Sequence, residues 1–203
     1  MKHEMKTLKL YITEALHVNK NTKIQIYNYH PKTKDELQDL VNKLIEERGD
    51  NADLNDIDTS KITDMSNLFF KSKFNGDISE WDVSNVERML HMFNQSKFTG
   101  DISKWDVSHV TNMQAMFYKS KFNGDISGWN VSNVEDMNGM FEESIFNGDI
   151  SKWNVSKVKN MHAMFYKSKF TGDISKWNVS KVKDMQNIFD YSPLADNLPK
   201  WYK

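Results

Sequence analysis

The sequence predicts an α/β repeat solenoid in which each 24-residue rung contributes one short parallel β-strand and one short helix. Three observations support this prediction: a strict repeat, a change of apolar spacing inside each copy, and a helix signal ahead of the first copy. The repeat is marked by tryptophans (Trp81, Trp105, Trp129, Trp153, Trp177 and Trp201) and by glycines (Gly76, Gly100, Gly124, Gly148 and Gly172). One copy cannot bury its own apolar face, so successive copies must stack.

Within one copy, the apolar spacing changes from a period of two to a helical period. Trp105 and Val107 alternate within residues 101–107, which predicts a short strand. The next apolar residues are spaced i, i+3, i+6 and i+7, which predicts a short helix: they are Val110, Met113, Met116 and Phe117. Gly100 and its equivalents are expected at positive φ, where glycine is favoured.

Stacking the strands as a parallel sheet would place rungs about 4.8 Å apart and make equivalent residues neighbours. The tryptophans would then form one ladder. A phenylalanine ladder would comprise Phe69, Phe93, Phe117, Phe141, Phe165 and Phe189, with methionines filling the space beside it. We therefore interpret this stripe as core and expect no cofactor to bind there.

Two polar columns accompany the apolar ones. The first comprises Asp77, Asp101, Asp125, Asp149 and Asp173, and the second comprises Asp82, Asp106, Asn130, Asn154 and Asn178. A carboxylate after glycine can accept from nearby backbone N–H groups, so we expect Asx-type turns. A calcium column would need a denser cluster of Gly and Asp, and the second column loses its charge halfway. The serines two residues after the second column, such as Ser108, are expected to cap the following helix.

A helix is predicted at about residues 33–48, ahead of the repeats. Thr33 and Glu36 form a capping box, apolar residues follow at helical spacing, and Gly49 ends the pattern. Residues 23–29 are rich in β-formers and predict a short strand. We therefore divide the chain into a leader and α/β cap at 1–52 and a solenoid of about six repeats at 53–203.

The bulk composition gives little direction about partners. The formal net charge is −1, with +6 on residues 151–203 (ten Lys, four Asp) and therefore −7 on residues 1–150. Cysteine is absent, no apolar run is long enough to span a membrane, and no export signal is evident. The six histidines fall at unrelated phases of the repeat, which argues against a metal column. We expect no catalytic residues, no cofactor, no metal and no nucleic-acid partner, and a cytoplasmic or virion-associated location ahead of the cell surface.

The residues from Met5 to Leu16 form a short amphipathic segment. This segment resembles the capsid-targeting leader of internal head proteins in T4-like phages. Those leaders also begin Met-Lys-Thr and run into an apolar-x-Glu site, which here matches Ile12-Thr13-Glu14. The resemblance implies cleavage after Glu14; the alternative is a docking helix.

The repeats match the pattern Trp-Asp/Asn-Val-Ser-x-Val-x-x-Met-x-x-Met-Phe, as from Trp105 to Phe117. This pattern resembles the BspA-like leucine-rich-repeat surface proteins of bacteria, in particular the mycoplasma-type repeat family of unknown function. The resemblance covers residues 54–201. It implies a leucine-rich-repeat-like solenoid that binds proteins or mediates adhesion.

Function within the repeats is expected where the copies differ, because packing dictates the constant positions. One such position precedes each tryptophan: it holds Glu80, Lys104, Gly128, Lys152 and Lys176. The other is a pair near the end of each copy: Asn94-Gln95, Tyr118-Lys119, Glu142-Glu143, Tyr166-Lys167 and Asp190-Tyr191. Exposed tyrosines and lysines suit protein recognition. The candidate partner-binding residues are Lys104, Tyr118, Lys119, Lys152, Tyr166, Lys167 and Lys176.

Three functions follow from these observations. The first is a non-enzymatic protein-binding scaffold, carried in or on a phage particle. The second is a bacterial surface adhesin that binds host proteins. The third, an enzyme accessory or nucleic-acid binder using the lysine-rich C-terminal end, has the least support.

Overall fold

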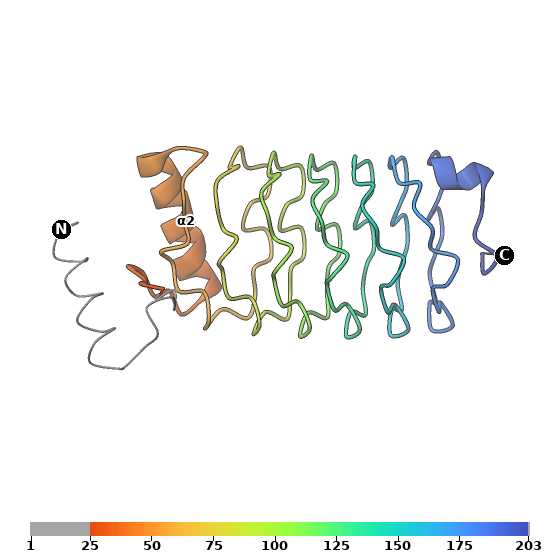
Figure 1. Cartoon of the computed structure of the whole chain (residues 1–203), viewed down its shortest axis with the longest axis horizontal. Helices are drawn as coiled ribbons and strands as arrows, with labels where there is room; N and C mark the ends of the chain where they lie inside the picture. The colour runs from red at the N-terminus through yellow and green to blue at the C-terminus, as the bar shows by residue number, and fades with distance from the viewer. Residues whose placement is uncertain (1–24, 203) are drawn as a thin grey trace, which may run out of the picture.

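The computed structural model describes residues 25–202 of the chain. In Figure 1, these residues form an elongated stack of similar layers with a helix at one end and the C-terminus at the other. The described part contains one α-helix, α2 (Lys34–Arg48), and one 3-10 helix, η1 (Pro193–Asp196). Single parallel bridges link positions 24 residues apart: Asp53↔Asp77, Asp64↔Arg88, Arg88↔Asn112, Asn112↔Asp136, Asp136↔Asn160 and Asn160↔Asp184.

The prediction of an α/β solenoid with one strand and one helix per rung is therefore wrong. Apart from the short 3-10 helix η1, no repeat within the described range forms a helix, and pairing between rungs is limited to isolated bridges. Because the rungs lack both elements, the leucine-rich-repeat-like architecture is not observed. The rungs are stacked, but each consists of a series of turns.

Local hydrogen bonds explain why residues 101–107 form no strand. The carboxylate of Asp101 accepts from the backbone N–H of Ser103 (2.9 Å), and the N–H of Trp105 donates to the carbonyl of Ile102 (3.2 Å). The Asp106 carboxylate accepts from the N–H of Ser108 (3.0 Å) in the same way. These bonds turn the backbone sharply, so it cannot extend along a neighbouring rung.

The expected helix at residues 110–117 is prevented by a different feature. Ala115 has a φ of 50° and Lys119 a φ of 51°, which is left-handed backbone. The N–H of Met113 donates to the carbonyl of Asp136 in the next rung (2.9 Å), while that of Met116 donates locally to Met113 (3.2 Å). Because backbone bonds alternate between the next rung and the same rung, no helix forms for Ser108 or its equivalents to cap.

The Asx turns predicted for the first polar column are confirmed. The carboxylates of Asp77, Asp101, Asp125, Asp149 and Asp173 each accept from the backbone N–H two residues later at 2.9 Å. The second column forms the same turn whether the residue is Asp106 (3.0 Å) or Asn130 (3.2 Å). The turn needs only an oxygen acceptor, so the loss of charge along this column does not change the backbone.

The core consists of stacked aromatic rings. Phe93 and Phe117, one rung apart, stack with centroids 5.7 Å apart and an interplanar angle of 4°. A second phenylalanine ladder, which the sequence reading missed, lies beside the first; Phe98 and Phe122 stack in it at 6.3 Å and 6°. Its members are Phe74, Phe98, Phe122, Phe146 and Phe170, all with no exposed surface.

Each tryptophan also donates to a carbonyl of the preceding rung, in a bond that is buried for all but Trp201. The indole N–H of Trp129 donates to the carbonyl of Ile102 (3.1 Å), and the same pattern joins Trp105 to Ile78 (3.2 Å). Trp129 is 3 % exposed. The tryptophan column therefore fixes the register between rungs as well as filling the core.

The glycine that begins each copy does not adopt positive φ, contrary to the prediction. Among described residues, the glycines at positive φ are Gly49 (89°) and Gly139 (58°). At Gly100, a Cβ atom would lie 2.8 Å from the ring of Phe98. Glycine is needed there because the second phenylalanine ladder packs directly against the backbone.

The helix predicted at residues 33–48 is confirmed as α2. The hydroxyl of Thr33 accepts from the N–H of Glu36 (3.2 Å), and the Glu36 carboxylate accepts from the N–H of Lys32 (2.6 Å). The expected strand at 23–29 is reduced, in its described part, to one bridge between Tyr29 and Ile57.

Candidate functional site: an exposed column of aromatics and lysines

The pair near the end of each copy forms a column along one side of the stack. Alternate rungs carry an aromatic residue followed by lysine, 48 residues apart, and the last rung adds a tyrosine. We call this set the aromatic–lysine column: Phe70, Lys71, Tyr118, Lys119, Tyr166, Lys167 and Tyr191. The rungs between carry polar or acidic pairs, Asn94-Gln95 and Glu142-Glu143.

Each lysine of the column lies over an aromatic ring. Lys71 Nζ is 4.9 Å from the centroid of Phe70, and Lys119 Nζ is 5.1 Å from that of Tyr118. The structure therefore brings the predicted residues Tyr118 and Lys119 into contact. Such cation–π contacts preorganise a cationic and apolar surface.

The column is densest at its C-terminal end. Lys167 Nζ is 5.1 Å from the ring centroid of Tyr166 and 5.5 Å from that of Tyr191. The two tyrosine rings meet edge to face, with centroids 5.5 Å apart. Tyr191 is 76 % exposed, the highest value among the large exposed hydrophobic residues described. A partner that covered this cluster would remove aromatic surface from water.

The backbone beneath the column is fixed. Lys119 and Lys167 both have a φ of 51°, and their N–H groups donate to carbonyls of the next rung, Glu142 and Asp190, each at 2.9 Å. The side chains therefore project from a hydrogen-bonded scaffold, which lowers the entropy cost of binding.

The acidic rung modifies the charge of the column. Lys119 Nζ forms an ion pair with Glu143 (3.3 Å), and bonds to Tyr118 and then Glu143 raise the pKa of Lys119. Burial, followed by repulsion from Glu143, raises the pKa of Glu142. Cationic rungs of the column are therefore separated by a neutral pair, Asn94-Gln95, and by an acidic pair, Glu142-Glu143.

The other predicted lysines form a separate column. Lys104, Lys152 and Lys176 are exposed, each directly before a tryptophan. Bonds from Ser103 chiefly lower the pKa of Asp101, and Lys104 adds to that effect. No described contact joins these three lysines to Tyr118, Tyr166 or Tyr191, so the seven predicted residues belong to two surfaces. Glu14, the predicted processing site, lies outside the described residues.

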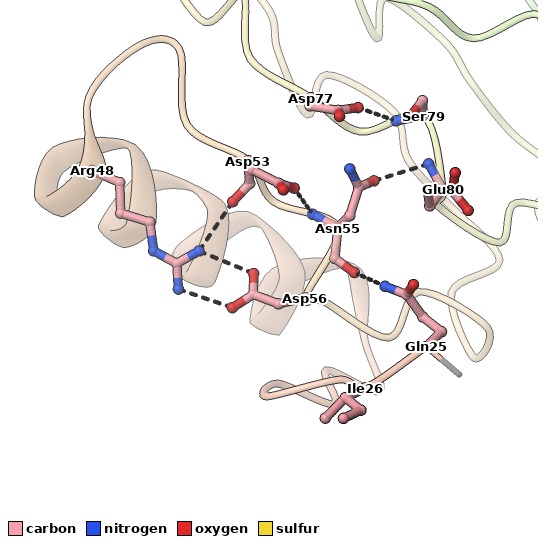
Figure 2. A pocket seen from close by; sticks show the side chains of 9 residues that line it. All are labelled: Gln25, Ile26, Arg48, Asp53, Asn55, Asp56, Asp77, Ser79 and Glu80. Carbon is pink, nitrogen blue, oxygen red and sulfur yellow. Dashed lines mark hydrogen bonds and ion pairs between the residues drawn. The ribbon is translucent and has the colours of Figure 1, made fainter. Parts of the chain in front are cut away.

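A hollow of about 430 Å³ lies where α2 meets the first rungs. Figure 2 shows the side chains that line it. The Arg48 guanidinium donates to both carboxylate oxygens of Asp56 (3.0 Å each) and to the carbonyl of Asp53 (3.1 Å). The Asn55 side chain accepts from the N–H of Glu80 (2.9 Å). These groups hold the helix, the first rung and the second together, which is a structural role.

The described part of the chain contains no further group of side chains arranged for metal binding. Within residues 25–202, no group of three His, Asp or Glu side chains is placed to hold a metal ion. His91 contacts Asn94 (2.7 Å), and His162 lies 3.5 Å from Asp184, so the histidines have different neighbours. No helix in this range is both long and apolar enough to cross a bilayer.

These features define a stacked-repeat protein with an aromatic and cationic surface column. The family model described as "Mycoplasma protein of unknown function, DUF285" matches residues 38–145 and again residues 97–201, so the chain belongs to this family. The match confirms the mycoplasma-type repeat family. No curated protein and no solved structure matches.

The sequence reading missed one part of the column. Phe70 and Lys71 were not selected, although they stand 48 residues before Tyr118 and Lys119 and hold the same phase. They belong to a half-copy of the repeat that precedes Gly76, and the comparison of variable positions covers only the full copies after it. Extending the comparison of variable positions to that half-copy would have found them.

Proposed function

We propose that this protein is a non-enzymatic scaffold that binds a protein partner through the aromatic–lysine column. The observation that carries the proposal is the cluster of Tyr166, Lys167 and Tyr191, in which the ammonium group of one lysine lies over two tyrosine rings. Aromatic and cationic side chains held in a fixed geometry are typical of binding hot spots.

The chemistry of the column specifies its partner. Cationic rungs alternate with the acidic pair Glu142-Glu143, at intervals of about 10 Å if rungs are spaced like paired strands. A protein segment with an acidic residue beside an apolar one would complement Tyr166 and Lys167. Shape and charge together would fix its register along the column.

The test is to select binders from a library of short random peptides and then map where they bind. The column variant is Tyr166→Ser with Tyr191→Ser. The matched control carries Lys152→Ser and Lys176→Ser, which changes two exposed residues in the same two rungs. Most selected peptides are expected to lose at least about tenfold in affinity for the column variant, equivalent to about 1.4 kcal/mol, and to bind the control normally. Peptides that bind both variants equally, or favour the Lys152 surface, would refute the proposal.

Where this binding takes place is a prediction with two alternatives, a bacterial surface and a phage particle. The resemblance to BspA-like surface proteins favours adhesion at a bacterial surface, which cell fractionation of the native protein tests. The resemblance around Glu14 favours carriage in a phage particle, which mass spectrometry of purified particles tests by the presence of a chain cut after Glu14.

A further inference from the structure

Four exposed lysines lie together on one side of the stack. Lys157 and Lys159 stand on either side of a core valine, and Lys181 and Lys183 hold the same positions one rung later. We call these four residues the lysine corner. The backbone N–H of Lys183 donates to the carbonyl of Lys159 (2.8 Å), so the two rungs are in register here. The four side chains therefore leave the backbone as two adjacent pairs.

The lysine corner lies on the side of the stack and not at its end. Lys157 and Lys159 have one rung before them and another after them, and both are exposed; the side chain of Lys159 is 50 % exposed. His109 and Thr111 hold the same positions in a central rung and are exposed as well. The exposure of these positions therefore does not depend on which residues follow the last rung.

The charge at these two positions changes along the stack. Both positions are lysine in the two rungs of the corner, and the earlier rungs have at most one lysine there. The earlier pairs, in chain order, are Lys61 and Thr63, Asn85 and Glu87, His109 and Thr111, and Asn133 and Glu135. The residue after each tryptophan changes in the same sense, from aspartate at Asp82 and Asp106 to asparagine at Asn130, Asn154 and Asn178. Acidic groups thus become fewer where the lysines appear.

The backbone does not require this loss of aspartate. Asp106 accepts from the N–H of Ser108 at 3.0 Å, and Asn154 accepts from the N–H of Ser156 at 3.2 Å, so both form the same turn. An aspartate at position 154 would make that turn and would add a carboxylate to the rung of Lys157. The amide instead leaves the positive charge of the corner uncompensated.

Few carboxylates of the protein compensate the corner. Lys159 Nζ lies 2.7 Å from Glu135 Oε2 in the preceding rung. No ion pair within residues 25–202 includes Lys157, Lys181 or Lys183. Like charges opposite each other in adjacent rungs are destabilising, and a bound anion would relieve this repulsion. The corner therefore has the charge of an anion-binding surface.

We propose that the lysine corner binds an acidic polysaccharide, whose sulfate or carboxylate groups contact the four ammonium groups. If the rungs are spaced like paired strands, the lysines repeat about 5 Å apart along the stack and about 7 Å apart within a rung. One chain with an anionic group on each sugar unit would then meet several lysines at once. The amide and hydroxyl groups beside the corner, at Asn154, Ser156, Asn178 and Ser180, can bond to sugar hydroxyls.

Two other kinds of partner fit the corner less well. No exposed aromatic side chain occurs in residues 152–159 or 176–183, so nucleic-acid bases would have nothing on which to stack. The exposed residues of these two stretches are all polar, so a protein segment would find no apolar anchor either. This absence distinguishes the lysine corner from the aromatic–lysine column.

The test measures the binding of a fluorescent heparin octasaccharide to the full 203-residue chain by fluorescence anisotropy. The corner variant is Lys157→Ser with Lys181→Ser, because neither lysine forms an ion pair. The matched control is Lys152→Ser with Lys176→Ser, which removes the same charge from the same two rungs. Unchanged thermal unfolding midpoints show that both variants remain folded.

The two variants are expected to differ. The corner variant should lose at least about tenfold in affinity, and the control less than about threefold. The control should lose less because the ammonium groups of Lys152 and Lys176 interact with the carboxylates of Asp149 and Asp173. The affinity of the parent protein should also fall as the salt concentration is raised.

Further probes identify the ligand. A hyaluronate octasaccharide carries carboxylates without sulfate: binding of both saccharides supports recognition of either anionic group, and binding of heparin alone supports recognition of sulfate. Tyr166→Ser with Tyr191→Ser should bind the heparin octasaccharide as the parent protein does, which separates this proposal from the proposed function. The proposal is overturned if neither saccharide binds, if the two lysine variants lose affinity equally, or if a single-stranded octanucleotide binds more tightly than both saccharides.

Discussion

The first and the last rung of the stack differ in how completely their apolar surfaces are covered. At the N-terminal end, α2 covers the first rung with three fully buried side chains, and Arg48 binds Asp56 through two nitrogens. At the C-terminal end, η1 and Trp201 cover one half of the last rung, while Met185 and its neighbours stay half-buried. Figure 1 shows this asymmetry between the long helix and the short turn of helix.

The two ends also differ in the hydrogen-bonding groups that they present at the positions equivalent to 161–167, whose N–H groups donate to the next rung. A helix offers side-chain donors such as Gln38 to an edge of carbonyls. An edge of N–H groups needs acceptor oxygens, and a helix has already used most of its backbone carbonyls internally. Along the positions equivalent to 161–167, the N-terminal edge presents carbonyls and the C-terminal edge of the described residues presents N–H groups.

Shortening a buried side chain of α2 should lower the free energy of unfolding more than any other change. Leu37→Ala is expected to destabilise the protein by about 2–5 kcal/mol, because the surrounding side chains cannot fill the cavity. Met185→Ala, in the last described rung, should cost about 1 kcal/mol, because that side chain is already partly in water. Urea unfolding compares the two variants; equal losses would show that the ends are equally well covered.

The hydrogen bond from the tryptophan indole should contribute more to stability in the middle of the stack than at its C-terminal end. Trp129→Phe removes an indole N–H bond and leaves a gap in the core. The Ile102 carbonyl keeps a second donor, the N–H of Trp105. We expect a loss of about 1–3 kcal/mol. Trp201→Phe, at the half-buried end, should cost less than about 1 kcal/mol. Thermal unfolding measured for both variants checks this order, and a larger loss at Trp201 would contradict it.

Acid should loosen the N-terminal end through Asp56. Burial raises the pKa of Asp56, but hydrogen bonds from Arg48 and Asn28 outweigh it, so the folded pKa lies below the usual 3.8. This contribution is fully present above the unfolded pKa and is lost as pH falls through the folded pKa. Asp56→Asn should cost about 1 kcal/mol near neutral pH, because the partly exposed pair is screened, and should weaken the acid dependence below pH of about 4. Asp196→Asn, in η1, is the control and should change stability by less than about 0.5 kcal/mol. Identical acid titrations of the Asp56 variant and the parent would contradict this account.

An effect of similar size concerns the first of the two left-handed positions of each rung. Gly139→Ala places a side chain at a φ of 58°, and its Cβ would lie 3.1 Å from the Glu142 carboxylate. We expect a loss of about 1 kcal/mol. Asn187→Ala tests the same phase in the last rung and should cost less, because asparagine itself tolerates positive φ only in part. Denaturant midpoints measure both; no loss at Gly139 would mean that this backbone relaxes.

The sequence predicted the parts of the fold that local chemistry determines. The capping box of Thr33 and Glu36 correctly predicted α2, and the Asp after each glycine correctly predicted the Asx turns. The repeat itself identified the first phenylalanine ladder. These features depend on residues close together or on identical phases, so they are visible without coordinates.

The secondary structure of the rung could not be predicted in the same way. Ala115 and Lys119 adopt left-handed backbone, which their residue types disfavour, because bonds to the next rung hold them there. The spacing of Met113, Met116 and Phe117 predicts a helix because the sequence does not show these bonds to the next rung. The contacts of Lys167 with two tyrosines and the half-buried state of Met185 likewise depend on how rungs meet, which one repeat does not reveal.

Residue-resolved amide exchange of the protein alone tests the account most directly. The account predicts protected amides at Met161, Ala163, Phe165 and Lys167 and fast exchange at their counterparts Met185, Asn187, Phe189 and Tyr191. Equal protection in the two sets, or no protection in either, would contradict an account in which these four positions of each rung donate to the next rung and those of the last described rung have no acceptor.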